Sequence, residues 1–374
     1  MKYLLPLMAV CLLLAALSQW HTSQYTIPGT PYKHFTDWAY LLIIVILAIF
    51  AGTRVRYNDT MNYIRAFEKA QPLSVFLSDP RNFSLFRNPL FELYRSFLKT
   101  YTDNARWLIL TSSVFTQVCF IRFIKRYSED FTLSIFLYFT LGTFAFSLAA
   151  IKQVLAMAII TLAFPYLERH KWVRYYLMVL IAMMFHTYAI VYVMLPLFRR
   201  RPWKMFTFFF MAVMMLILFN FEEALTAFMN QANDLGKTLS DEEVFGEATI
   251  NIFRLAVYAI PPLISFLLSR WALAGNTEMD NILIHMSIIS FAFMSLGTQA
   301  GANMFGRMAN FFEIGTLCCL PKMLRKSFEK QSFYMISCVA AICFLGFFYY
   351  ANVVKLDFSI WYQRESLLSL LLGR

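Results

Sequence analysis

The chain has 374 residues, of which 59 % are hydrophobic and 15 % are charged. Soluble globular domains average about 45–50 % apolar and about 25 % charged residues, so this composition excludes a soluble domain, a disordered chain and a disulfide scaffold. It predicts an all-α, polytopic integral membrane protein. The formal net charge of +11 names no partner, because Lys and Arg accumulate in cytoplasmic loops of membrane proteins. We therefore expect no nucleic-acid partner.

Apolar runs recur along the whole chain. A helix needs about 20 mostly apolar residues to cross a bilayer. The runs that approach this length lie at 3–20, 38–53, 107–121, 131–150, 153–167, 173–198, 205–221, 250–269, 281–298, 308–321 and 332–352. The sequence therefore predicts about 11–12 transmembrane helices in a single membrane domain over residues 1–374.

The run 173–198 is flanked by short basic loops on both sides, one around Arg169 and one at Arg199 to Arg201. A single span would place these loops on opposite faces of the membrane, whereas the positive-inside rule places both in the cytoplasm. His186 lies at the middle of this run. We therefore predict two short helices that meet outside the membrane near His186.

With this break, the remaining loops alternate between the two faces and most basic residues of the short loops fall inside. Both termini then lie outside, as do a long loop at 54–106 and an acidic loop at 222–250. Apolar residues recur at helical spacing in the long loop, at Met61, Ile64 and Phe67 and at Leu90, Leu93, Tyr94 and Phe97. This spacing predicts amphipathic helices on the membrane surface. The excess of basic residues in the loop fits either anionic lipid headgroups or an anionic substrate.

Ionisable residues gather at the predicted outer ends of the spans. They are Arg54, Arg56, Asp59, Lys152, His186, Arg254 and Arg307. Arg offers a planar fork to phosphate oxygens and Lys a point charge, so the set suits a diphosphate-bearing lipid and could stabilise the charge of a departing diphosphate. A carboxylate or an imidazole there could take a proton from an acceptor hydroxyl.

Each of these residues also has a structural explanation. Asp59 precedes Thr60 and belongs to the residue types preferred as helix caps. His186 at a helix break could bond exposed backbone carbonyls. Lys152 and Arg307 at span ends could extend their charges toward lipid headgroups. The residue pattern leaves both explanations open.

Metal and disulfide chemistry have little support in the sequence. The six cysteines lie inside apolar runs, without a CxxC pair or a histidine at metal-ligand spacing, which indicates buried thiols that pack as small hydrophobic groups. The chain has no DxD motif, which favours a metal-independent reaction. We expect no metal and no cofactor.

Four segments resemble those of one family in order and spacing. They are 51–60 with its Arg, Asp and Thr after the second span, 150–156 with Lys-Gln-x-x-Ala, 185–189 with Phe-His, and 307–312 with Arg and Phe-Phe. Together they resemble the EpsG family of exopolysaccharide and O-antigen polymerases, the Wzy type. Lys152 stands where that family usually has Arg, which keeps the charge and loses the bidentate fork. Tyr188 stands where Ser is usual.

The resemblance implies a membrane glycosyltransferase with a GT-C-like, all-helical fold in the bacterial inner (cytoplasmic) membrane. Such an enzyme would transfer a growing glycan from undecaprenyl diphosphate to a new lipid-linked repeat unit on the outer face of that membrane. The partners implied are undecaprenyl-diphosphate-linked glycans, membrane lipids and a chain-length regulator.

The resemblance also implies roles for individual residues. The diphosphate would be bound by the cationic side chains Arg54, Arg56, Lys152 and Arg307, with Arg254 added for its position at an outer span end. Gln153 would bond sugar or phosphate. Asp59 or His186 would orient or deprotonate the acceptor hydroxyl. A carboxylate among several guanidinium groups is a weak base, so His186 competes for that role.

Three other functions stay open. An O-antigen ligase, or another lipid-diphosphate-dependent glycosyltransferase, would use the same chemistry on a different acceptor. A lipid-linked oligosaccharide flippase is a transporter and would line a membrane-deep cavity with charges, whereas these charges lie near one face. A non-catalytic scaffold would tolerate substitution of Asp59 or His186.

Overall fold

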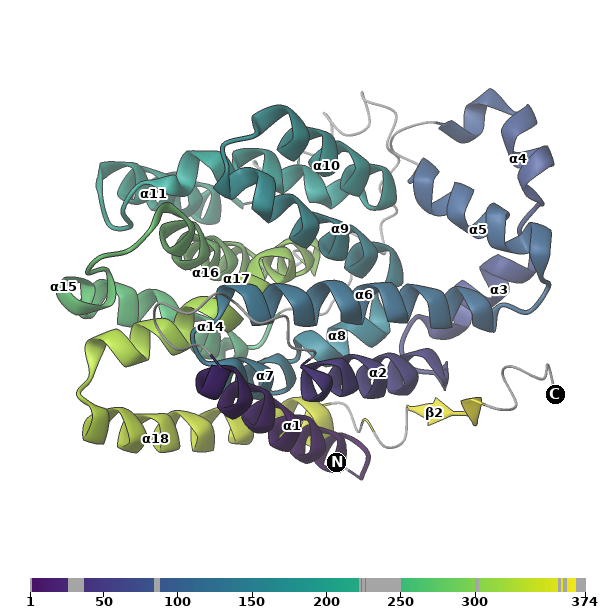
Figure 1. Cartoon of the computed structure of the whole chain (residues 1–374). Helices are drawn as coiled ribbons and strands as arrows, with labels where there is room; N and C mark the ends of the chain where they lie inside the picture. Colours follow the sequence, from purple (N-terminus) through teal and green to yellow (C-terminus); the bar gives the residue numbers. More distant parts are fainter. Residues whose placement is uncertain are drawn as a thin grey trace. The chain divides into compact units, whose positions relative to one another are not determined.

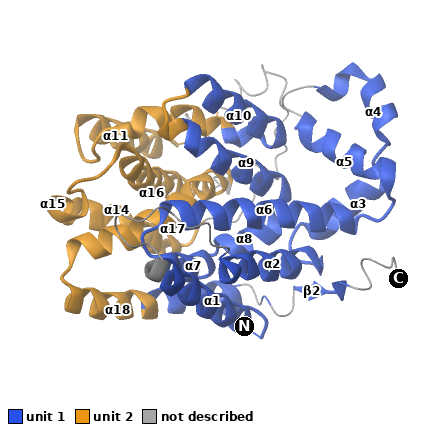
Figure 2. Cartoon of the chain, in the orientation of Figure 1, with its two compact units in different colours: residues 1–166, 172–189, 343–374 blue, residues 167–171, 190–342 orange. Residues whose placement is uncertain are grey.

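The computed structural model describes residues 2–25, 37–83, 88–221, 223, 226, 250–299, 303–355, 358 and 362–367. The chain forms two compact units, coloured in Figure 2. Unit 1 consists of residues 1–166, 172–189 and 343–374, and unit 2 of residues 167–171 and 190–342. Helices make up almost all of the described structure (Figure 1), which confirms the predicted all-α class. The single-domain organisation and the GT-C-like arrangement stay predictions.

Unit 1 begins with the elements that carry three of the four family-like segments. In chain order they are α1 (Leu4–Tyr25), α2 (Trp38–Gly52), β1 (Arg54–Arg56), α3 (Thr60–Glu68), α4 (Leu73–Ser78), the 3-10 helix η1 (Pro80–Phe83), α5 (Pro89–Tyr101), α6 (Arg106–Tyr127), α7 (Phe131–Thr140), α8 (Thr143–Ala149), α9 (Ile151–Glu168) and α10 (Trp172–Phe185).

The later elements include those of unit 2 and the C-terminal part of unit 1. They are the 3-10 helix η3 (Thr187–Arg199), α11 (Met205–Phe219), α14 (Ile252–Leu267), α15 (Ser269–Ala272), α16 (Glu278–Leu296), α17 (Asn303–Ser327), α18 (Lys330–Tyr349), the π-helix η4 (Tyr350–Lys355) and β2 (Gln363–Arg364). The predicted acidic loop 222–250 lies almost wholly outside the described residues.

Five helical segments among the described residues are long and apolar enough to cross a membrane. They are Leu4–Thr22, Arg106–Tyr127, Ile151–Glu168, Glu278–Leu296 and Lys330–Lys355. The pair α7 and α8 would make a sixth span, bent by 53°, and α2, α10, η3, α11 and α14 are shorter apolar helices. The sequence predicted more full-length spans, because apolar composition does not reveal where a run stops being one straight helix.

Two predicted runs are divided in the structure. The run 173–198 separates into α10 and η3 on either side of His186, as predicted. The run 131–150, expected as one span, instead breaks between α7 and α8. Gly142 adopts a φ of 93° at this break, a conformation that is accessible to glycine and strained for other residues.

Close packing of α2 on α6 fixes the C-terminal end of α2, directly before the first predicted site residues. These two helices lie side by side in unit 1 (Figure 1). A Cβ added to Gly52 would lie 3.2 Å from the Cα of Leu110, so a side chain there would push the two helices apart. Glycine therefore serves the close approach of the backbones at the last residue of α2.

The helices of the long loop do form, and they pack on the protein. Phe67 of α3 and Phe91 of α5 are buried in a cluster with residues of α6 and α9, including Leu108 and Leu155. Helix formation at α3 and α5 is therefore confirmed, and Phe67 of the predicted apolar set faces the protein. The position of these helices on the membrane surface stays a prediction. Burial against α6 and α9 removes the aromatic rings from water without a membrane.

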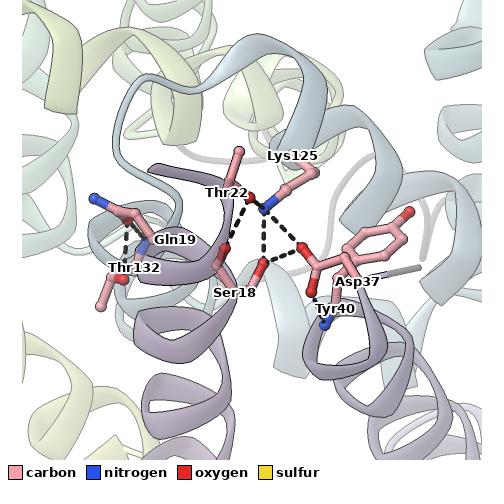
Figure 3. A network of polar contacts seen from close by, with 7 residues as sticks. All are labelled: Ser18, Gln19, Thr22, Asp37, Tyr40, Lys125 and Thr132. Atoms are coloured by element: carbon pink, nitrogen blue, oxygen red, sulfur yellow. Dashed lines mark hydrogen bonds and ion pairs between the residues drawn. The ribbon is translucent and has the colours of Figure 1, made fainter. Parts of the chain in front are cut away.

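A polar network joins the ends of three helices of unit 1 at the N-terminal end of α2 (Figure 3). Lys125 of α6 lies 3.1 Å from Asp37, the N-cap of α2, and donates to Ser18 of α1 at 2.6 Å. Asp37 also accepts from Ser18 at 2.6 Å and from the backbone N–H of Tyr40 at 3.0 Å. The loop ends that the predicted alternation assigns to the cytoplasm thus meet; the membrane face they occupy stays a prediction.

Asp37→Asn is expected to lower the free energy of unfolding by about 1.5–3 kcal/mol, the usual contribution of hydrogen bonds to a charged group. Burial acts to raise the pKa of Asp37, but the bonds from Ser18, Tyr40 and Lys125 outweigh it and hold the pKa below 3.8. The carboxylate therefore stabilises the fold above about pH 4 and loses this effect as the pH falls through the lowered pKa. Thermal unfolding of the detergent-purified protein between pH 3 and pH 7 measures both effects.

The matched control is Asp103→Asn, because Asp103 pairs with Lys99 at 2.8 Å while its side chain is 92 % exposed. Exposed pairs contribute about 0–1 kcal/mol. Equal losses in the two variants would contradict a stabilising role for the Asp37 network.

Large apolar side chains remain exposed on helices that would face lipid. On α11 they include Met205, Phe209 and Phe219, and on α18 Met335 and Ile342. Exposed apolar surface of this extent is expected of a protein in a bilayer. Two cysteines of α18, at positions 338 and 343, are also exposed, so the expectation of burial is wrong for them and holds for the other four.

Candidate functional site

Arg54 is buried inside unit 1 although the sequence predicts it to bind substrate. Its side chain is 2 % exposed. The guanidinium donates to the Thr60 hydroxyl at 3.3 Å, to the Ser113 hydroxyl at 2.9 Å, and to the backbone carbonyl of Ala51. Thr60 donates in turn to the carbonyl of Tyr57 at 2.6 Å. The Arg and the Thr of the family-like segment therefore clamp one turn of chain between α2 and α3.

No described residue places a carboxylate against the Arg54 guanidinium. Burial lowers the pKa of Arg54 to about 10, a shift that the neighbouring tyrosine rings only partly offset. The group stays protonated at neutral pH. A buried cation held by neutral oxygens fixes the shape of the loop, and its role in binding a diphosphate stays a prediction.

Arg56 points the other way on the same short strand. Strand β1 pairs antiparallel with β2 from the C-terminal segment, and Arg56 is exposed. Tyr362, just before β2, stacks on Phe50 with centroids 4.7 Å apart and donates to its carbonyl. Glu365 contacts Arg106 in two places. The C-terminal segment thus holds the strand that presents Arg56.

Asp59 occupies the N-cap position of α3 without capping it. Its φ and ψ are helical and its side chain accepts no capping bond; the backbone carbonyl instead accepts from Asn62 and Tyr63. The Asp59 side chain is partly exposed, and no described residue donates to the carboxylate. The capping explanation is therefore wrong, and the carboxylate is available to a ligand.

Lys152 lies in the first turn of α9 and is held by the long loop. Its Nζ is 3.2 Å from Oε1 of Glu92 on α5 and 4.9 Å from the ring centre of Phe91. Its backbone N–H donates to the Tyr63 hydroxyl of α3 at 3.4 Å. Gln153 is 2 % exposed. Lys152 is therefore engaged with protein, and extension into headgroups does not describe it.

His186 marks the break between α10 and η3. Its Nδ1 accepts from the backbone N–H of Tyr188 at 3.3 Å, and the two rings meet edge to face at 4.9 Å. Thr187 donates its backbone N–H to the Asn88 side chain at the start of α5, at 3.3 Å. The break that carries His186 is thus docked on the long loop within unit 1.

The predicted residues Arg254 and Arg307 belong to unit 2. Arg254 lies in the first turn of α14, because Asn251 caps that helix by accepting from the N–H of Phe253 at 2.8 Å. Arg254 donates to the Asn310 side chain at 3.1 Å and to the Tyr258 hydroxyl at 3.3 Å. Arg307 is exposed on α17.

Glu313 continues this unit 2 network. Its side chain is 2 % exposed and accepts from the Tyr258 hydroxyl at 2.7 Å. Tyr258 therefore joins a guanidinium to a buried carboxylate. Ionisable groups buried among membrane helices are costly and are retained where they serve a site.

Tyr258→Phe is expected to lower the free energy of unfolding by about 1–3 kcal/mol, because the Glu313 carboxylate loses a donor while it stays buried. The melting temperature of the purified protein measures this loss. Tyr334→Phe is the matched control, because Tyr334 lies on α18 of the same unit and is 59 % exposed. Equal melting temperatures for the two variants would contradict the network.

Sequence reasoning missed the residues that hold the predicted ones in place. They are Glu92, Arg95, Ser113, Tyr258, Asn310 and Tyr362. Asn310 lies inside a family-like segment, which was a usable signal. Tyr258 follows Arg254 by four residues and Arg95 follows Glu92 by three, and side chains at these spacings meet on a helix. Glu92, Ser113 and Tyr362 act across long separations, such as the 59 positions from Arg54 to Ser113, and no spacing rule covers these.

The fold and the polar residues define a multi-pass membrane protein with several charged side chains at its helix ends. The model of the EpsG family matches residues 37–363, so the chain belongs to the EpsG family, which confirms the resemblance. No curated protein and no solved structure matches it. Membership suggests a membrane protein of the exopolysaccharide or O-antigen polymerase type.

Proposed function

We propose that this protein polymerises undecaprenyl-diphosphate-linked oligosaccharide repeat units into O-antigen, capsule or exopolysaccharide on the outer face of the bacterial inner membrane. One observation carries the proposal. Helices α3 and α5 of the long loop join three family-like segments of unit 1: Thr60 bonds Arg54, Tyr63 bonds the backbone of Lys152, and Asn88 bonds Thr187 beside His186.

In this proposal Asp59 takes the proton of the acceptor hydroxyl. The hydroxyl oxygen bonds to the anomeric carbon of the growing glycan, the bond from that carbon to the diphosphate oxygen breaks, and undecaprenyl diphosphate leaves. Arg54, five residues before Asp59, is bonded to hydroxyl and carbonyl oxygens instead of Asp59.

His186 suits a different role. Because Nδ1 accepts from the Tyr188 N–H, the proton of the neutral ring is on Nε2, which is then a hydrogen-bond donor. We assign His186 to donate to the diphosphate or the acceptor sugar.

The remaining predicted residues divide by their surroundings. Arg56 and Lys152 of unit 1 bind the diphosphate, where positive charge stabilises the leaving group. For Arg254 and Arg307 of unit 2, the binding role that the family resemblance implies stays a prediction. Arg54 acts through the shape of the loop that it clamps. Gln153 is as deeply buried as Arg54, so its bond to sugar or phosphate stays a prediction of the family resemblance. A chain-length regulator and membrane lipids are the further partners.

The test is the length distribution of lipid-linked and surface glycans in the native host after deletion of the gene and complementation. Loss of the polymer ladder, with a single repeat unit retained on the surface, is the result expected of a polymerase. Full-length polymer that stays on its carrier lipid would assign a ligase instead. An unchanged ladder would contradict the proposal.

A further inference from the structure

Three charged side chains of unit 1 form a cluster in which two cations share one carboxylate. Glu92 of α5 contacts Lys152 through Oε1 at 3.2 Å and Arg95 through Oε2. The side chains of Lys152, Glu92 and Arg95 are 28 %, 19 % and 21 % exposed. The cluster is therefore largely buried, and its two cations and one carboxylate leave a net positive charge.

Arg95 has unused hydrogen-bonding capacity in this cluster. Its Nε–H is buried and has no hydrogen-bond partner among the described residues. Buried donors are rarely left unpaired, and the Nε–H and Nη2–H groups of a guanidinium form the fork that binds two oxygens of a phosphate. Lys152 provides only a point charge, so the fork that it lacks is present on Arg95.

The cluster is positioned by packing and by α5. Phe91, next to Glu92, is buried against Ile151, next to Lys152. At the start of the same helix, Asn88 accepts from Thr187, which follows His186. Helix α5 thus connects the cluster to the His186 break, and a ligand held by the two cations would lie on the loop that also docks the histidine.

We propose that Lys152 and Arg95 bind the phosphate oxygens of a lipid diphosphate, and that Glu92 occupies their binding positions until the ligand displaces it. The lipid part of this assignment rests on the proposed function. The diphosphate part rests on the cluster alone. Glu92 keeps two cations in place before the ligand arrives and competes with it.

The experiment measures the affinity of the full-length, detergent-purified protein for two probes, inorganic pyrophosphate and farnesyl diphosphate, by calorimetry. Arg95→Ala is expected to weaken both by about tenfold or more, because a charge-assisted pair of bonds is lost. Glu92→Gln is expected to tighten both by about three- to tenfold, because the internal competitor is removed. Arg81→Ala is the control, since Arg81 lies on the same loop with its side chain 84 % exposed. The affinities of this variant for both probes are expected to equal those of the wild type.

The sign of the Glu92→Gln effect decides between ligand exchange and a purely structural ion pair. Weaker binding in Glu92→Gln, together with a lower melting temperature, would overturn the proposal. Binding of pyrophosphate without farnesyl diphosphate would overturn the lipid assignment. Binding of either probe does not depend on polymerisation. Binding of both probes as expected by a protein that makes no polymer would overturn only the proposed function. Polymer formation together with probe affinities that Arg95→Ala leaves unchanged would overturn only this site.

Discussion

Arg54→Ala is expected to destabilise the folded chain by about 3 kcal/mol or more. It empties the space of a large buried side chain and leaves the carbonyl of Ala51 and the hydroxyl of Ser113 without their partner. Arg54→Lys is expected to destabilise the folded chain as well, because a single ammonium group cannot reach the three oxygens that the guanidinium joins. The melting temperature and the amount of folded protein in the membrane measure the effect.

Arg56→Ala is the matched control on the same strand. Its side chain is exposed, so the free energy of unfolding is expected to change by about 0.5 kcal/mol or less, while polymer formation falls about 10- to 100-fold through loss of a charge-assisted contact to phosphate. A stable Arg54→Ala protein that loses activity alone would contradict the structural role of Arg54.

The second large effect is expected at Asp59. Asp59→Asn keeps the size of the side chain and removes the base, so the turnover rate is expected to fall about 10²- to 10⁴-fold. The melting temperature is expected to stay the same, because no described residue bonds the carboxylate. Initial rates of elongation by the purified protein, measured at saturating lipid-linked substrate, test this.

His186→Ala provides the comparison for the catalytic assignment. As a donor to the bound substrate, His186 is expected to affect KM more than kcat, whereas Asp59→Asn reduces kcat. The reverse pattern, with kcat lost in His186→Ala and KM raised in Asp59→Asn, would exchange the two roles.

The sequence was sufficient for features that depend on neighbouring residues. Apolar runs predicted where the helices lie, and the two basic loops around 173–198 predicted the break at His186. The helical spacing at Met61, Ile64 and Phe67 predicted α3. These signals are local, since composition and periodicity act over a few turns of chain.

Other features depend on contacts between distant segments, and these could not be predicted. The burial of Arg54 needs Ser113 of α6 and the C-terminal pairing of β2 on β1. The partner of Lys152 is Glu92, 60 residues earlier in the chain. A charged residue in a family-like segment therefore looks the same in the sequence whether it faces a substrate or the protein interior.

The bend between α7 and α8 is an intermediate case. Gly142 was visible in the run 131–150, and a glycine can signal a positive φ. Glycine is also common in straight membrane helices, so the residue alone does not predict the 53° bend.

The most direct measurement reconstitutes the purified protein in liposomes with undecaprenyl-diphosphate-linked repeat units extracted from the gene-deleted host. We expect longer lipid-linked glycans together with release of undecaprenyl diphosphate, and neither product with the folded Asp59→Asn variant. Folded wild-type protein that leaves single repeat units unchanged, or that elongates them equally well with Asp59→Asn, would contradict this expectation.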